Sequence, residues 1–216
     1  MAVYLLRLLP IDLNHVGEDG ESALHLAVVY DGPQVVHFLF THRREELDLA
    51  RPDPLGYTAL HLAVVHKRPA ILRMLLDAPE PHVERVAAAS GASALILAVV
   101  HRFPEAVSLL LACPRAEVNR LDGSGRAALH HAVLQQDLAA VRLLVACPRV
   151  DVALPAADGR TALAFAALNA GREMVALLLG TGKADVGRRD GYGKRALDWA
   201  RLNTCAEVAE LLRNAR

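Results

Sequence analysis

The sequence predicts an all-α fold: a solenoid of stacked helix-turn-helix units joined by β-hairpin-like turns. Three observations predict it. A hexapeptide recurs six times, a glycine stands two residues before every copy, and an apolar segment of helical spacing follows each copy. The glycines, 34 to 36 residues apart, are Gly20, Gly56, Gly91, Gly125, Gly159 and Gly193. One supersecondary unit therefore repeats along most of the chain.

The hexapeptide predicts the start of the first helix of each unit. It reads small or hydroxyl residue, Ala, Leu, two variable residues, Ala, and its copies begin at Ser22, Thr58, Ser93, Ala127, Thr161 and Arg195. The preceding glycine suits a turn with positive φ, and the Ser or Thr can cap the helix. The Leu and the last Ala lie three apart and share one helix face. Ala127 and Arg195 lack a capping hydroxyl, which predicts a local loss of about 0.5–2 kcal/mol in the fourth and sixth units.

A second helix is expected after each first helix, because apolar residues again recur at helical spacing. The trios are Val36, Leu39 and Phe40; Leu72, Leu75 and Leu76; Val107, Leu110 and Leu111; Val141, Leu144 and Val145; Val175, Leu178 and Leu179; Val208, Leu211 and Leu212. Pro114 and Pro148 end two of these helices, since proline cannot continue a helix. Asp53, Asp122 and Asp190 at the turn starts favour turn geometry.

The unit resembles the ankyrin repeat, a turn plus two antiparallel helices with the hallmark T-P-L-H-x-A. His25, His61 and His130 occupy the hallmark histidine position, where the resemblance implies hydrogen bonds between neighbouring turns. Alanine replaces the hallmark proline throughout, and the usual glycine between the two helices is mostly absent. The resemblance implies a partial repeat or cap helix at 1–16, then repeats at 17–52, 53–87, 88–121, 122–155, 156–189 and 190–216.

The two ends of the array are expected to differ. In the last helix Glu207, Glu210 and Arg213 line the side opposite the apolar residues, as in a C-terminal cap. At the other end, residues 2–9 read as the second helix of a repeat whose first helix is missing. This segment is either a degenerate cap or the sign of a chain cut from a longer protein.

Composition narrows the class of protein. Lys plus Arg equals Asp plus Glu, 24 of each, which argues against a nucleic-acid partner. We expect no signal peptide and no membrane span, and the three scattered cysteines favour a reducing compartment, the cytoplasm with the nucleus as a further location. On its own the chain is expected to be monomeric.

We find no pattern that predicts an enzyme, a metal site or a cofactor site. Residues 180–183 (Gly-Thr-Gly-Lys) lack the spacing of a phosphate-binding loop, and no nucleophile elbow is present. The adjacent His130 and His131 point in different directions on a helix, a poor chelate. Cys113 and Cys147, at one repeat position, are expected too far apart for a disulfide.

A protein or peptide partner is expected on the concave surface of the stack. The residue after each glycine changes along the chain from Glu21 through Tyr57 to Arg126, Arg160 and Lys194, which suits acidic partner residues toward the C-terminal half. An aliphatic row near the ends of the first helices is either part of this groove or inter-repeat core. The binding candidates are Tyr30, Tyr57, Val65, His66, Val100, His101, Arg126, Leu134, Gln135, Arg160, Asn169, Tyr192 and Lys194.

The function expected is that of a non-enzymatic interaction module: a scaffold, an adaptor or an inhibitor. Residues 18–29 and 47–49 further resemble the opening of the inhibitor-of-NF-κB and Rel-precursor ankyrin domains, which implies a regulator of a Rel-type transcription factor. Another alternative is a targeting domain from a larger enzyme or channel. The ankyrin resemblance also makes Asn119 a candidate for asparaginyl hydroxylation.

Overall fold

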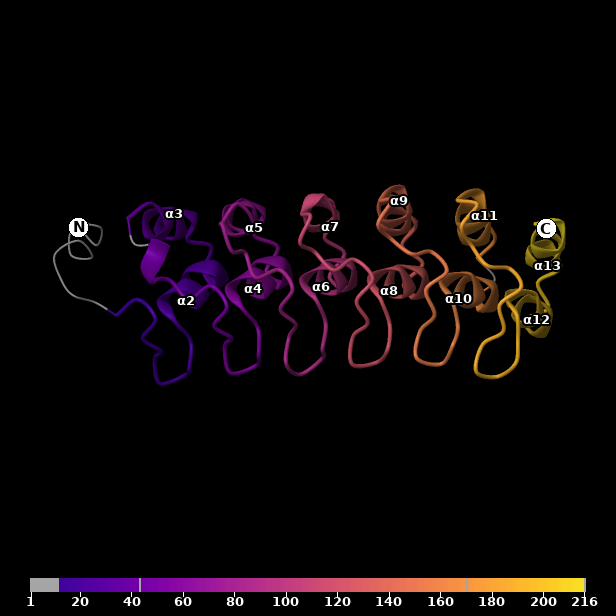
Figure 1. The fold of residues 1–216 in the computed structure, drawn as a ribbon, viewed down its shortest axis with the longest axis horizontal. Coiled ribbons are helices and arrows are strands. Elements are labelled where there is room, and N and C mark those ends of the chain that lie inside the picture. Colours follow the sequence, from indigo (N-terminus) through magenta and orange to yellow (C-terminus); the bar gives the residue numbers. More distant parts are fainter. Residues whose placement is uncertain (1–11, 43, 170, 216) are drawn as a thin grey trace.

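The computed structural model describes residues 12–42, 44–169 and 171–215. In this part of the chain, twelve α-helices form six stacked pairs, so the all-α solenoid prediction is confirmed (Figure 1). The first helices of units 1 to 6 are α2 (Ala23–Val29), α4 (Ala59–Val65), α6 (Ala94–Val100), α8 (Ala128–Leu134), α10 (Ala162–Leu168) and α12 (Ala196–Leu202). The second helices are α3 (Pro33–His42), α5 (Pro69–Leu76), α7 (Pro104–Ala112), α9 (Leu138–Ala146), α11 (Arg172–Gly180) and α13 (Ala206–Asn214). A 3₁₀ turn, η1 (Arg44–Glu46), follows α3.

The units line up in one direction with three layers (Figure 1). First helices form the middle layer, second helices lie on one side, and the hairpins that precede the first helices project on the other. Each helix contacts the equivalent helix of the next unit. We call the surface formed by the hairpins and the first helices the hairpin face.

The core lies between the layers and is built from small aliphatic side chains. The hexapeptide leucines Leu24, Leu60, Leu95, Leu129 and Leu163 are each at most 4% exposed. In the first five second helices, the first two members of each predicted trio are buried and the third is half-buried against the core. In α13 the order differs: Val208 and Leu212 are buried and Leu211 is half-buried.

In units 1 to 4 and 6, the turn between the two helices contains a left-handed residue that is not glycine. Asp31, Lys67, Arg102, Gln136 and Thr204 have φ between 51° and 54°. Residues other than glycine are disfavoured in this left-handed conformation by about 1 kcal/mol. The missing interhelical glycines therefore leave the fold intact, and each of these turns is locally strained.

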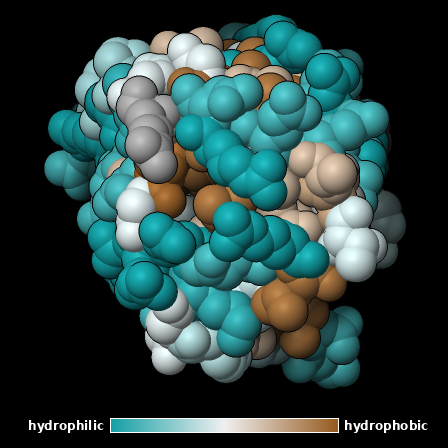
Figure 2. Space-filling view, turned by 90° about the vertical axis from the view of Figure 1, so that its right-hand side faces the viewer, coloured by the Kyte–Doolittle hydropathy of each residue, from teal (hydrophilic) through white to brown (hydrophobic). Residues whose placement is uncertain are grey.

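The described C-terminal end is a mostly hydrophilic surface (Figure 2). Val208, Ala209 and Leu212 of α13 are buried, whereas Glu207 and Glu210 are exposed. Such an outer face keeps apolar surface out of water at the end of an array. At the other end, the helix expected at residues 2–9, as a partial repeat or a cap, lies outside the described residues.

Candidate functional site

The hairpins are shaped by local sequence. All six repeat glycines have φ between 65° and 83°. In the second, fourth and sixth hairpins an aspartate closes the turn: Oδ1 of Asp53 accepts hydrogen bonds from the backbone N–H of Leu55 (2.9 Å) and Tyr57 (2.7 Å). Asp122 and Asp190 accept equivalent pairs. The aspartates therefore hold the tips that project from the hairpin face.

Backbone hydrogen bonds join successive hairpins into a row. The amide of Gly123 donates to Ser90 O (2.8 Å), Ala157 to Gly125 O (2.9 Å) and Gly191 to Asp158 O (2.9 Å). Ala88 donates to Gly56 O over 3.3 Å. Pro54 stands at the corresponding position of the second hairpin and has no N–H to donate. The tips of units 2 to 6 are thus bonded to one another, and the first pair lacks this bond.

The hallmark histidines connect units from within. The backbone N–H of Ser22 donates to Nδ1 of His25 (3.1 Å), which leaves Nε2 of His25 to donate to Arg51 O of the next hairpin (3.1 Å). His130 bonds the amide of Ala127 and Leu154 O in the same way. The hydrogen bonds implied by the family resemblance are present for these two. Nε2 of the buried His61 meets the Arg85 backbone only outside strict hydrogen-bonding geometry. Burial lowers the pKa of His61 to about 4, although this backbone contact acts to raise it.

Two first helices start without a capping hydroxyl, as expected. Ala127 and Arg195 provide no side-chain cap for α8 and α12. The reverse bond persists in both: the amide of Ala127 donates to His130 Nδ1 (3.0 Å) and that of Arg195 to Asp198 Oδ2 (3.0 Å). The fourth and sixth units therefore keep one of the two cap bonds that unit 1 forms and lack the other, as the sequence predicts.

Three cations follow the glycines of the last three hairpins, as the sequence places them. Arg160 is the most enclosed: its guanidinium pairs with Asp158 Oδ2 (2.5 Å), and its side chain is only 16% exposed. It also lies over the rings of Phe165 (4.6 Å), Trp199 (5.5 Å) and Tyr192 (5.6 Å to the centroids). Arg160 is thus a structural group that joins the fifth and sixth hairpins to first helices. Reversing the charge of Arg160 would destabilise the fold as well as change the binding of any partner.

Arg126 and Lys194 flank this cluster. The Arg126 guanidinium lies 5.9 Å from the Phe165 ring centroid, and the Lys194 ammonium lies 5.3 Å from that of Trp199. Both side chains are half-buried. The hairpin face of units 4 to 6 therefore alternates cations with aromatic rings, an arrangement that limits the motion of the cations.

Sequence reasoning missed the way two aspartates brace the first helices. His131 Nε2 and Asp122 Oδ2 are 2.7 Å apart, and Trp199 Nε1 donates to Asp190 Oδ2 (2.6 Å). Burial acts to raise the pKa of Asp122, but hydrogen bonds from Ser124, the Arg126 backbone and His131 hold that pKa below its ordinary value. The shared nine-residue spacing of the two pairs was the available signal. Each pair locks a hairpin onto its helix.

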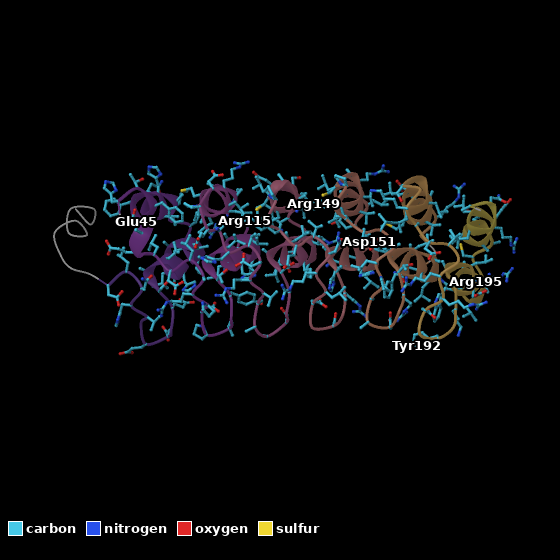
Figure 3. All side chains as sticks on the ribbon, in the orientation of Figure 1. Glu45, Arg115, Arg149, Asp151, Tyr192 and Arg195 are labelled. Carbon is cyan, nitrogen blue, oxygen red and sulfur yellow. The ribbon has the colours of Figure 1, made fainter. Side chains whose placement is uncertain are left out.

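The candidate rows at the ends of the first helices are partly exposed. Tyr30, His66, His101, Gln135 and Asn169 are the C-caps of their helices. Tyr30 is 79% exposed and Val100 39%; Val65 and Leu134 are half-buried against the core. Tyr192, 60% exposed, lies at the tip of the last hairpin (Figure 3). The aliphatic row thus contributes both to packing and to accessible surface.

Asn119 bridges two units through both ends of its amide. Its Nδ2 donates to Arg149 O (2.8 Å), and its Oδ1 accepts from the amide of Asp151 (2.8 Å). Asn14 forms the same pair of contacts with Glu46 and Asp48 three interfaces earlier. This geometry gives Asn119 a structural role, and its hydroxylation stays a prediction.

The three cysteines form no disulfide in the described part of the chain. Cys113 and Cys147 are the C-caps of α7 and α9, and their thiols are free. Within the described ranges, no three His, Cys, Asp or Glu side chains are placed to hold a metal ion together. No helix in that part of the chain combines the length and apolar character needed to cross a membrane.

Comparison with known proteins gives one consistent family. The family model for ankyrin repeats in three copies matches residues 2–86 and 78–155, and the model for a single ankyrin repeat matches residues 158–191. Neither describes an enzyme family. No curated protein sequence matches.

Solved structures match over most of the chain. The crystal structure of the ankyrin repeat domain of Bcl-3, described as a unique member of the IkappaB protein family, is similar with a TM-score of 0.81 and 29% identity. The match covers 92% of this chain and 87% of that one. The ankyrin repeat protein EF0377 is similar in fold, with a TM-score of 0.79 and 23% identity over 92% of this chain and 98% of that one.

Proposed function

The chain belongs to the ankyrin repeat family, and from this premise we propose that it is a non-enzymatic scaffold, adaptor or inhibitor that binds a partner on its hairpin face. Ankyrin repeat domains are generally protein-binding modules and typically non-catalytic. The proposal assigns binding to the candidates on the hairpins and at the ends of the first helices.

One observation carries this proposal: accessible aromatic and aliphatic side chains stand on a rigidly bonded face. Tyr192 and Val100 are 60% and 39% exposed, although backbone bonds tie the hairpins of units 2 to 6 to one another. Tyr30, in unit 1, is 79% exposed. Aromatic side chains contribute strongly to protein interfaces, and a preorganised surface loses little entropy on binding. A face of this kind suits a protein or a peptide.

The test compares affinity capture from cell lysate by three forms of the full chain. The first is unchanged, and the second carries Tyr30→Ser, His66→Ser and Val100→Ser on the hairpin face. The third is a matched control with Gln34→Ser, Ala70→Ser and Ala139→Ser at exposed positions of second helices. We expect specific partners to be lost only from the second form, with equal melting temperatures for all three. Equal capture by all three forms, or loss only from the third, would reject the hairpin face as the binding surface.

A narrower candidate is an inhibitor-of-NF-κB-like regulator of a Rel-type transcription factor. It is supported by the 29% identity to the Bcl-3 domain over most of both chains, together with the resemblance of residues 18–29 to that group. A pulldown with purified Rel-homology domains tests it. If the Rel-homology domains retain the unchanged chain but not the hairpin-face variant, the result would support this candidate. If they do not retain the unchanged chain at micromolar concentration, the candidate is rejected.

A further inference from the structure

The cations of the last three hairpins are not equivalent. Arg160 is already neutralised, because Asp158 pairs with its guanidinium through both Nε (2.8 Å) and Nη2 (2.5 Å). Among the described residues, no carboxylate lies within ion-pairing distance of Arg126 or Lys194. Two cations therefore remain without a salt-bridge partner on this part of the hairpin face, one on each side of the Arg160–Asp158 pair, and the Asp158 carboxylate attracts Arg126 only over a longer distance.

Aromatic rings hold both of these cations in place. Phe165 lies beneath Arg126 and Trp199 beneath Lys194, and Trp199 is itself fixed by the hydrogen bond to Asp190. A cation restrained in this way loses less side-chain entropy when it pairs with an anion. We call Arg126, Lys194 and the rings beneath them the cationic strip. The strip therefore loses less side-chain entropy on binding carboxylates than two free surface lysines would.

Charge is also unevenly distributed along the solenoid. Residues 12–52 contain eight Asp and Glu and three Lys and Arg, whereas residues 156–216 contain seven and ten. An acidic ligand is consequently repelled from unit 1 and attracted to units 5 and 6. The overall neutrality of the chain conceals this polarity.

We propose that Arg126 and Lys194 bind two acidic side chains of an extended segment of the protein partner, laid across the hairpins of units 4 to 6. Adjacent packed helices are about 8–10 Å apart, so these cations, two units apart, are separated by roughly 16–20 Å. An extended chain advances about 3.3 Å per residue, so the carboxylates are five to six residues apart in sequence. This inference rests on the proposed function and adds the chemistry and spacing of the ligand.

The experiment uses the full chain and fluorescein-labelled peptides in fluorescence anisotropy. The first peptide carries two Glu-Glu pairs whose centres are six residues apart in a Ser-Thr spacer. A second has the same charge with the pairs adjacent, and a third has Gln in place of Glu. The test variant is Arg126→Gln with Lys194→Gln. The matched control, Lys183→Gln with Arg213→Gln, removes two exposed cations that lie away from Arg126 and Lys194 and form no ion pair among the described residues.

We expect the spaced acidic peptide to bind best, with affinity that falls as salt is added. The test variant should weaken it about five- to tenfold, as two restrained surface ion pairs would, and the control less than about twofold. Equal binding of the Gln peptide or of the adjacent-pair peptide, or equal loss in both variants, would overturn the inference. A captured partner that is lost in the Tyr30/His66/Val100 variant but retained in the Arg126/Lys194 variant would refute this inference and leave the proposed function standing.

Discussion

Arg149 provides a direct test of how neighbouring units are held together. It follows α9, and its guanidinium reaches back to the C-terminal end of α7 in the preceding unit (Figure 3). There it donates to four carbonyl oxygens: Leu111 (2.6 Å), Cys113 (3.0 Å), Ala116 (3.0 Å) and Pro114 (3.1 Å). A positive charge also complements the negative end of the helix dipole. We therefore predict that Arg149→Ala destabilises the fold substantially.

The magnitude follows from these contacts. Because the side chain is exposed, each hydrogen bond is taken at the lower limit, about 0.5 kcal/mol, which gives a total loss near 2 kcal/mol. For a chain of this size, that loss lowers Tm by roughly 4–8 °C. Arg115 occupies the same position one unit earlier and donates a single bond, to Pro79 O (3.0 Å). Arg115→Ala should cost only about 0.5 kcal/mol.

Urea denaturation followed by circular dichroism compares the two variants under one condition. Arg149→Ala should also make the transition less cooperative, because weakening one interface in a linear array separates the units on either side. Equal losses for Arg149→Ala and Arg115→Ala would show that the four-carbonyl contact contributes nothing specific, and our reading of the unit interface would be refuted.

Three further predictions concern the turns and the buried histidine. Lys67→Gly should stabilise the fold by about 0.5–1 kcal/mol in urea denaturation, since φ is 53° there, whereas Lys67→Ala should have little effect; equal changes would refute the strain. Gly159→Ala should cost about 2 kcal/mol or more, because the new Cβ would lie 2.7 Å from the Gly191 nitrogen; Gly193→Ala, with no neighbour within 4 Å, should cost about 1 kcal/mol, and a reversed order of melting temperatures would contradict this. Burial lowers the pKa of His61 from 6.5 to about 4, so the unfolded chain binds the extra proton between these values and stability falls as pH drops below 6.5, by roughly 3 kcal/mol at pH 4. A His61→Leu variant should lose less stability over this range, and parallel urea midpoints would contradict the assignment.

The local parts of the fold could be predicted from sequence because their causes are local. A glycine two residues before a capping Ser or Thr specifies a turn and a helix start without reference to the rest of the chain, and Gly20 to Ser22 is one example. The helical spacing of apolar residues, three and four positions apart, identified both helices of each unit. The sequence showed that glycine is mostly absent between the two helices. It did not show that Lys67 and Arg102 adopt left-handed backbone, because the packing of the helices imposes this conformation against the intrinsic preference of both residues.

The details of the candidate site could not be predicted in the same way. Arg160 reads in sequence as a free cation. Its pair with Asp158 forms within one hairpin, but only the stacking of units brings the rings of Tyr192 and Trp199 from the next unit against it. Whether a residue of the aliphatic row belongs to the core or to the surface depends on the exposed fraction of its side chain. Val100 is partly exposed, whereas Val65 packs against the core. Contacts between units depend on geometry that a repeat pattern alone does not contain.

Hydrogen exchange with mass spectrometry tests the central claim most directly, on the full chain with and without a captured partner. We predict that the partner increases protection in the hairpins and the first helices, most of all in peptides covering the hairpins before α8, α10 and α12. The second helices should be unchanged. Protection concentrated on α5, α7 and α9, with unchanged exchange in the hairpins, would contradict the assignment of the hairpin face as the docking surface.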